Sequence, residues 1–232
     1  MKKSLFAAAV AVLIGVTFNP ASAELFIDPS VKSAAGKVYG SAFFGTSEVD
    51  YDIENTSDNI EVERTFLGIS GAYGINDTVD IYAGFALITK AEAEYYPDDD
   101  SGTAIAFGAR GVFPLQSGIM LGGYAQYLLV DEDYGSIGNT SLSAEGSALS
   151  LGLVATKAID NITLYGGAEL IVMSDGEVKY NNGFNTVKYD AEYDDVLGIR
   201  AGARIDAGAI DVNFGLAIMH ETGFTIGISK GF

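Results

Sequence analysis

Few residues in this chain could carry chemistry. There is a single histidine, His220, and Glu221 follows it. Nucleophilic catalysis by a serine would need a histidine base in contact with it and a carboxylate that orients this base. Consecutive residues of a strand point to opposite faces, so Glu221 would point away from His220 if a strand continued there. We therefore predict no catalytic residues, and an enzyme that uses His220 is the least expected function.

The sequence offers few of the residues that metal binding and thiol chemistry require. The chain has no cysteine and one histidine, which argues against disulfides, thiolate catalysis and the usual zinc sites. Acidic stretches occur at 95–102, 130–135 and 189–195, and hard cations prefer oxygen ligands. None of these stretches has the spacing of an EF-hand loop. We predict solvated loop charge and no cofactor or metal site, with weak Ca²⁺ or Mg²⁺ association at the cell surface as the alternative.

The charge balance excludes one class of partner. The chain has 31 acidic and 13 basic residues, and its formal net charge is −18. Binding to a phosphate backbone requires a basic surface. We therefore expect no nucleic-acid partner.

The first 23 residues have the plan of a secretory signal peptide. Lys2 and Lys3 precede an apolar run over 5–16, and Ala21-Ser22-Ala23 follows. Positive charge, apolar run and small-residue cleavage site occur in the order that export signals use. The sequence predicts cleavage after Ala23 and export, followed by a periplasmic N-terminal lead-in at 24–36.

The hydrophobic residues of the remaining chain alternate. In 197–205 every second residue from Leu197 to Ile205 is apolar, and the residues between them are small or charged. The same alternation occurs in 149–156 and 210–218. A period of two predicts strands with one apolar face. No apolar run after residue 23 approaches the roughly 18 residues that a membrane-spanning helix needs.

The strands pair as hairpins along the chain. Short turns are expected near 76–77, 116–117, 160–161 and 207–208, where Asn, Asp, Gly or Ser occur. On the other side, longer acidic links are expected at 54–60, 95–102, 132–142 and 174–192. This organisation predicts an antiparallel up-and-down arrangement of about ten strands, with eight as the alternative.

The apolar face needs an apolar surrounding. The alternate face carries many Gly, Ala and Ser residues together with charges, which suits a barrel lumen better than the core of a sandwich. A closed barrel satisfies every backbone group in lipid. We predict an all-β transmembrane barrel over 37–232, with short periplasmic turns and longer acidic extracellular loops.

Six charged residues are predicted to point into the lumen, because a charge that faces lipid at the midplane costs about 2–4 kcal/mol. The small inward residues would leave space around them. Either the charges form a network that plugs the barrel, or they form a constriction that selects ions or solutes. The six residues are Arg64, Lys90, Arg110, Glu169, Arg200 and Arg204.

The C-terminal strand carries a resemblance to a known family. Phe224, Ile226 and Ile228 alternate with small or polar residues, and the chain ends on Phe232. This pattern resembles the C-terminal signature of Gram-negative outer-membrane β-barrel proteins, such as the small porin-like and OmpA-transmembrane-domain-like barrels. Lys230 departs from it. The resemblance implies that the last strand closes the barrel and is recognised by the barrel-assembly machinery.

This resemblance also implies a bacterial outer-membrane location, with lipid and lipopolysaccharide around the protein. The leading functional hypothesis is a small porin-like channel for ions or small solutes. The alternative is a closed barrel that serves as a structural, adhesive or surface-interaction module. The oligomeric state stays open.

Overall fold

The computed structural model describes residues 33–53, 59–93, 96–115, 118–137, 139–193, 196–219 and 222–232. The predicted signal peptide, its cleavage site after Ala23 and most of the predicted lead-in lie outside these residues, as do His220 and Glu221. No helix in the described part of the chain is long and apolar enough to cross a membrane.

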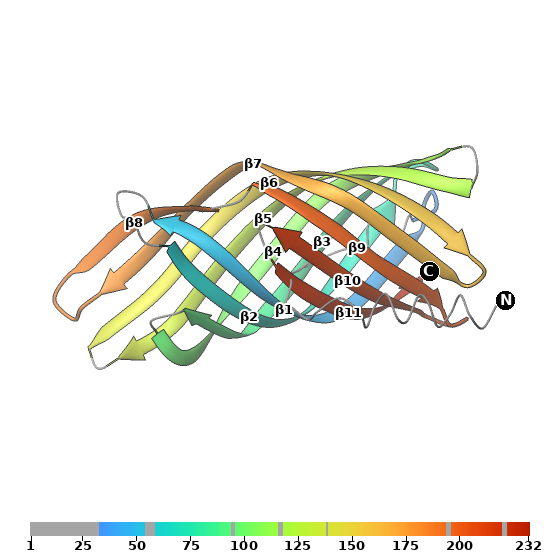
Figure 1. The fold of residues 1–232 in the computed structure, drawn as a ribbon. Coiled ribbons are helices and arrows are strands. Elements are labelled where there is room, and N and C mark those ends of the chain that lie inside the picture. Colours follow the sequence, from blue (N-terminus) through green and yellow to red (C-terminus); the bar gives the residue numbers. More distant parts are fainter. Residues whose placement is uncertain are drawn as a thin grey trace.

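Strands make up almost all of the described chain, and they wrap around one axis with a strong tilt (Figure 1). Each strand pairs antiparallel with its neighbours, as the alternating pattern predicts. The strands are β1 (Val38–Ile53), β2 (Asn59–Gly74), β3 (Val79–Ala93), β4 (Tyr96–Pro114), β5 (Ile119–Ile137), β6 (Thr140–Ile159), β7 (Ile162–Asn181), β8 (Thr186–Tyr193), β9 (Leu197–Asp206), β10 (Asp211–Met219) and β11 (Thr222–Gly231).

The sheet closes into a ten-stranded barrel, which confirms the predicted fold class. Neighbours in sequence pair in turn from β1 to β7, β7 pairs with β9, and β9, β10 and β11 follow. The last strand pairs with the first from Tyr39↔Gly231 to Glu48↔Thr222. Closure leaves no free edge in the part of the wall where these ten strands run side by side.

The eleventh strand, β8, changes the barrel at its outer end. It pairs with β7 over 176–181 and with the end of β1 over 51–53. At the outer end β8 alone connects β7 to β1, whereas in the rest of the barrel β9, β10 and β11 make this connection. The barrel therefore narrows from a ring of ten strands to the ring β1–β8. Eight strands enclose a space that side chains alone can fill.

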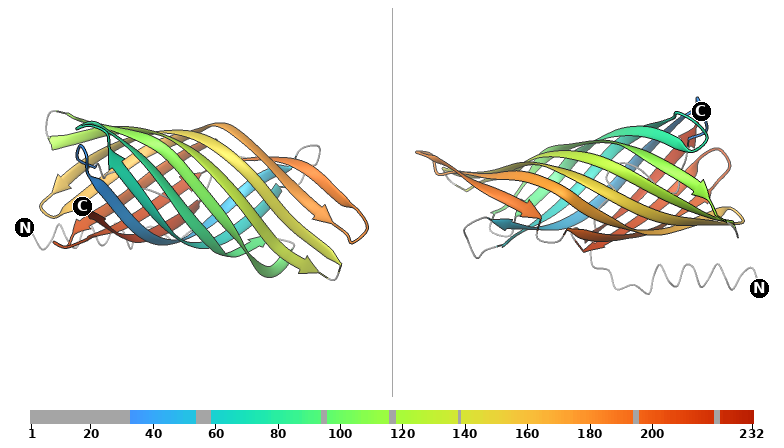
Figure 2. Two further views of the ribbon diagram at one scale, coloured as in Figure 1. Left: turned by 180° about the vertical axis from the view of Figure 1, so that it is seen from behind. Right: turned by 90° about the horizontal axis from the view of Figure 1, so that it is seen from above.

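The links that the sequence analysis assigns to long loops are mostly strand. The segments 96–102, 132–137, 140–142, 174–181 and 186–192 continue β4 to β8 as paired ladders. The hairpins β5–β6 and β7–β8 consequently project beyond the rest of the barrel (Figure 2). The short turns expected near 76–77, 160–161 and 207–208 lie between paired strands, and the one near 116–117 lies outside the described residues. At the first of them the Asn76 side chain accepts hydrogen bonds from the N–H groups of Thr78 and Val79.

The outer face is apolar around the middle of the barrel. Large side chains on this face are 39–65% exposed and would contact lipid. They come from all parts of the ten-stranded wall and include Phe44, Leu67, Ile69, Phe85, Leu87, Ile105, Phe107, Leu151, Leu153, Leu164, Leu170, Ile199 and Ile218.

Candidate functional site

The lumen is the first candidate site, and aromatic rings fill much of it. A Cβ atom built on Gly152 would lie 2.1 Å from the Tyr124 ring, so the ring occupies the space that a side chain would need. The small inward residues were expected to leave space around the lumen charges, but at these glycines rings from other strands occupy that space. The other glycines covered by rings are Gly45 by Phe66, Gly68 by Phe43, Gly108 by Tyr82 and Gly202 by Tyr165.

The outer half of the lumen combines an apolar core with one ion pair. Arg64 on β2 donates two hydrogen bonds to Glu132 on β5, and its Nη2 lies 2.7 Å from Glu132 Oε2. The Tyr134 hydroxyl donates to the same oxygen at 2.9 Å. Strands β3 and β4 lie between the two partners in the wall, so the pair reaches across the lumen. Around it pack Val62, Phe66, Ala86, Ile88, Ala91, Ala93, Ala104, Ala106, Leu142, Val178 and Ala191, all buried.

A second ion pair lies on β7 and β9. Arg200 Nη2 donates to Glu169 Oε1 at 2.7 Å, and the Tyr124 hydroxyl donates to the other oxygen of Glu169. Arg200 and Glu169 are each 4% exposed. Pairing of this kind offsets part of the cost of removing both charges from water.

The third ion pair lies at the short-turn end. Arg110 donates to both carboxylate oxygens of Asp80, at 2.9 and 2.6 Å. The backbone N–H of Ser33 donates to Asp80 at 3.0 Å, and Ser33 is buried. The segment 33–37 thus folds back against this mouth of the barrel, and Gly36 N donates to Gly74 O at 2.8 Å. Nothing in the sequence pattern indicates this contact.

Gly74 allows the backbone of residues 33–37 to approach β2 closely, because it has no side chain. A Cβ atom at Gly74 would lie 2.1 Å from the Ala34 carbonyl oxygen. We expect Gly74→Val to displace residues 33–37 and to lower the free energy of unfolding by about 1–3 kcal/mol, because backbone must move. Hydrogen exchange at the Ser33 amide measures the displacement directly.

Gly71→Val is the matched control, since a Cβ atom there has its nearest neighbour, Tyr39 O, at 3.8 Å. Unchanged protection of the Ser33 amide in the Gly74 variant would show that the segment does not depend on this glycine.

The six residues predicted to point into the lumen differ in their location in the structure. Arg64, Arg110, Glu169 and Arg200 are buried inside the barrel, and each is paired with an opposite charge. Arg204 is half-buried and donates to the Thr163 hydroxyl at 3.4 Å. A role for these five residues in selectivity stays a prediction.

The inward placement of Lys90 is wrong. The register of β3 shifts between Ile88 and Ala91, and both of these residues are buried. A β-bulge inserts one residue and so exchanges the faces that follow it. Lys90 therefore lies on the outer face, 35% exposed, in an ion pair with Glu92.

The main residue that the sequence analysis misses is Glu132, which it places in a loop. One signal could have found it. Leu128, Val130, Glu132 and Tyr134 share one parity, which would continue the strand and direct the carboxylate inward.

The C-terminal residues lie on the outer face of β11. Ile226 and Ile228 are exposed there and Phe224 is partly exposed, and Phe232, directly after β11, is also exposed. Phe232 N donates to Val38 O at 2.8 Å, so the last residue joins the seam between the first and last strands. Recognition of these residues by the assembly machinery stays a prediction.

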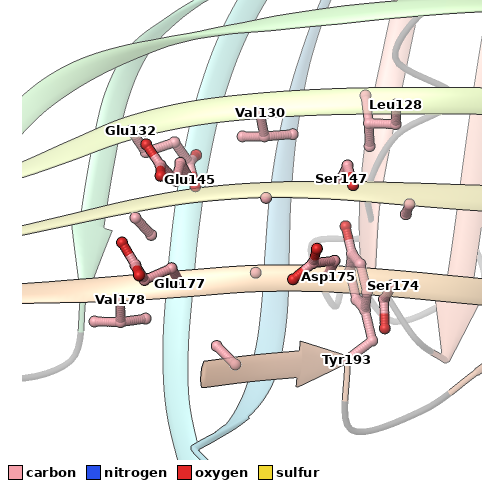
Figure 3. Close-up of a pocket in the computed structure, with 15 residues that line it drawn as sticks. Leu128, Val130, Glu132, Glu145, Ser147, Ser174, Asp175, Glu177, Val178 and Tyr193 are labelled. Carbon is pink, nitrogen blue, oxygen red and sulfur yellow. The ribbon is translucent and has the colours of Figure 1, made fainter. Parts of the chain in front are cut away.

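A small cavity lies beside the apolar core, between β5, β6, β7 and the end of β8 (Figure 3). Its volume is about 40 Å³, and its lining includes Leu128, Val130, Val178 and Tyr193. An apolar cavity that binds benzene has about 150 Å³. This cavity is therefore a packing defect beside the apolar core rather than a ligand site.

Outside the barrel, the projecting hairpins are strongly acidic. Lys179 contacts Glu145 at 2.6 Å, and Lys188 contacts Glu177 at 2.8 Å. The hydrogen bond from Lys188 lowers the pKa of Glu177, and the hydrogen bond to Glu145 raises the pKa of Lys179. Both pairs are solvent-exposed and add little stability.

A separate group of carboxylates, Glu48, Glu61 and Glu63, lies on β1 and β2. Their oxygen atoms lie within 4.8 Å of one another, an arrangement that could hold a hard cation. Exposed acidic groups of this kind are common without an ion, so the prediction of no metal site is kept.

Comparison with known proteins supports the fold. Neither a family of proteins nor a curated protein matches the sequence. The outer membrane protease OmpT from Escherichia coli superposes with a TM-score of 0.58 at 9% identity, over 88% of this chain and 100% of that one. OprG from Pseudomonas aeruginosa (TM-score 0.47, 10% identity, 88% and 99% covered) and an outer membrane channel from Pseudomonas putida F1 (0.46, 14%, 89% and 100%) are also similar. The chain therefore has the fold of outer-membrane β-barrel proteins.

Proposed function

We propose that this protein is an outer-membrane barrel closed to solutes, which acts through its extracellular surface. The observation that carries the proposal is the pair Arg64–Glu132, which crosses the outer half of the lumen inside an apolar core. Both side chains are at most 3% exposed. The lining of a water-filled pore would be accessible to water, and these side chains are not.

The narrowing of the wall supports the same conclusion. At the outer end the ring β1–β8 surrounds Val62, Tyr134, Leu142, Val178 and Ala191, all buried. Eight strands leave room for side chains and little else. Lipid and lipopolysaccharide would surround the apolar belt, and the extracellular hairpins would be free to meet a partner.

A channel, which was the leading hypothesis from the sequence, is now the second candidate. The periplasmic half of the lumen favours it because polar groups are common there. Ser41 and Ser70 hydroxyls are in contact at 2.5 Å, and the Tyr82 hydroxyl lies 3.4 Å from Gln126 Oε1. Solute passage would still require the Arg64–Glu132 barrier to open.

Single-channel conductance in a planar bilayer separates the two candidates. We expect no discrete steps from the folded wild-type protein, because the buried Arg64–Glu132 pair and the apolar cluster around it occupy the outer half of the lumen. The triple variant Arg64→Ala/Phe66→Ala/Glu132→Ala removes the barrier and is expected to produce steps if it still folds.

Circular dichroism and gel mobility without heating verify that each preparation is folded. Discrete steps from the wild-type protein would overturn the closed-barrel proposal in favour of the channel. The reversal potential in a salt gradient would then show whether the lumen prefers cations or anions.

A further inference from the structure

The outer face of the projecting hairpins has a groove of about 580 Å³. It runs over β4, β5, β6, β7 and β8 at the outer edge of the apolar belt, and it includes Ile105 of that belt. Gly146 and Gly176 are register partners on β6 and β7 and lie among its lining residues. At these two positions only backbone lines the groove. Nothing in the barrel's closed lumen requires a hollow on the outer face.

One wall of the groove is a row of carboxylates on four adjacent strands. The register pairs Asp131 with Glu145, Glu145 with Glu177, and Glu177 with Asp190. Like charges directly opposite each other on neighbouring strands destabilise a sheet. Four such carboxylates side by side therefore lower the stability of this part of the sheet. Their presence must have a reason other than folding stability.

Two lysines offset only part of this charge. Lys179 and Lys188 form ion pairs with Glu145 and Glu177. Among the described residues, the remaining groove carboxylates of Asp131, Asp175 and Asp190 have no salt bridge. The groove keeps a net negative charge after its internal pairs are counted.

The other wall is apolar and lies toward the membrane. Leu129 and Ile105 are register partners on β5 and β4, and they are 41% and 45% exposed. Leu129 lies two residues before Asp131 on the same face of β5. The groove thus places an apolar strip beside an acidic row at the level where lipid gives way to water.

We propose that this groove docks a cationic amphipathic segment of a peptide or protein lying at the membrane surface. The apolar side of such a segment would contact Leu129 and Ile105, and its lysine or arginine side chains would reach Asp131, Asp175 and Asp190. Charge complementarity decides the sign of the partner, since an anionic lipid or acidic protein would be repelled. The proposal rests on the proposed function, because it assigns a partner to the extracellular surface.

The dimensions suit a short helix. Five strands spaced about 4.8 Å apart give a groove length of about 19 Å. A helix rises about 1.5 Å per residue, so about 13 residues cover this length. Such a helix places cationic side chains three and four residues apart on one face.

The test uses the protein reconstituted in phosphatidylcholine nanodiscs and a fluorescent 14-residue amphipathic peptide of Leu and Lys. Fluorescence anisotropy measures its Kd against empty nanodiscs. We expect saturable binding that weakens as salt rises, and Asp131→Asn/Asp175→Asn/Asp190→Asn to raise the Kd about tenfold. A Leu/Glu peptide of the same length should not bind.

Glu48→Gln/Glu61→Gln/Glu63→Gln is the matched control, since it removes the same charge from β1 and β2 outside the groove. It should change the Kd less than about twofold. An equal loss in this control would mean that the general negative field binds the peptide, and would overturn the groove. Leu129→Ser should weaken the Leu/Lys peptide and leave a Ser/Lys peptide unaffected, and the opposite result would exclude the apolar wall.

Conductance in the same preparation keeps the two proposals apart. Absence of both conductance and peptide binding would sink the docking proposal alone. Discrete steps together with groove-dependent binding would overturn the closed barrel and leave the docking site standing. Calcium binding to the wild-type protein with no peptide binding would replace the docking site with a cation site.

Discussion

Replacing Glu132 with alanine is expected to lower the free energy of unfolding by about 3–5 kcal/mol. The substitution leaves the Arg64 guanidinium inside an apolar core, with the partner of its two hydrogen bonds gone. The Tyr134 hydroxyl loses its acceptor at the same time. Removing one partner of a buried ion pair is far more costly than replacing both partners with apolar residues.

Urea unfolding in detergent micelles, followed by far-UV circular dichroism, measures this change; the chain has no tryptophan for fluorescence. The double variant Arg64→Met/Glu132→Leu is the control, because it removes both charges and keeps similar volume. We expect it to recover most of the loss, since an apolar pair can replace a buried ion pair at little cost. Equal stability of Glu132→Ala and the wild type would show that water reaches Arg64, as a channel requires.

Gly152→Val is expected to lower the free energy of unfolding by about 3 kcal/mol. The three nearest heavy atoms to a Cβ atom at this position all belong to the Tyr124 side chain, at 2.1–2.5 Å. The Tyr124 ring must move away, and its hydroxyl then loses the hydrogen bond to Glu169. The effect therefore combines overpacking with the loss of a hydrogen bond to a charged group.

Gly123→Val provides the comparison, because a Cβ atom at Gly123 has its nearest neighbour, on Leu153, at 3.5 Å. It should change stability by less than about 1 kcal/mol. Gly152→Val and Tyr124→Ala should couple, the double variant losing at least about 1 kcal/mol less than the sum of the single variants. Additive losses would mean that the ring does not fill the space over Gly152.

Local pattern determined much of this protein. Alternation in stretches such as 197–205 was enough to predict strands, their lipid-facing side and a closed antiparallel barrel, because side-chain direction in a strand follows from residue parity. The same parity placed Arg64, Arg110, Glu169 and Arg200 inside, since a charge in lipid is too costly. The acidic composition predicts no nucleic-acid partner without any knowledge of the fold.

Parity failed where the backbone departs from regular pairing. A bulge needs only one extra residue, and at Lys90 it exchanged the inward and outward faces. No sequence pattern around Lys90 predicts the bulge. The extended strands were missed for a related reason: acidic residues look like loops in sequence, although neighbouring ladders hold them in β6 and β7.

Whether the lumen is open was a matter for the tertiary structure alone. The sequence could supply inward glycines and inward aromatic residues, but only the register places the Tyr124 ring over Gly152 on the next strand. Only the strand order brings Glu132 across the lumen to Arg64, and only the pairing of β8 with β1 narrows the outer ring. Each of these contacts joins residues far apart in the chain, so no local pattern encodes them. The sequence by itself determined that a barrel forms and which way its faces point; how that barrel is filled was decided by register and strand order.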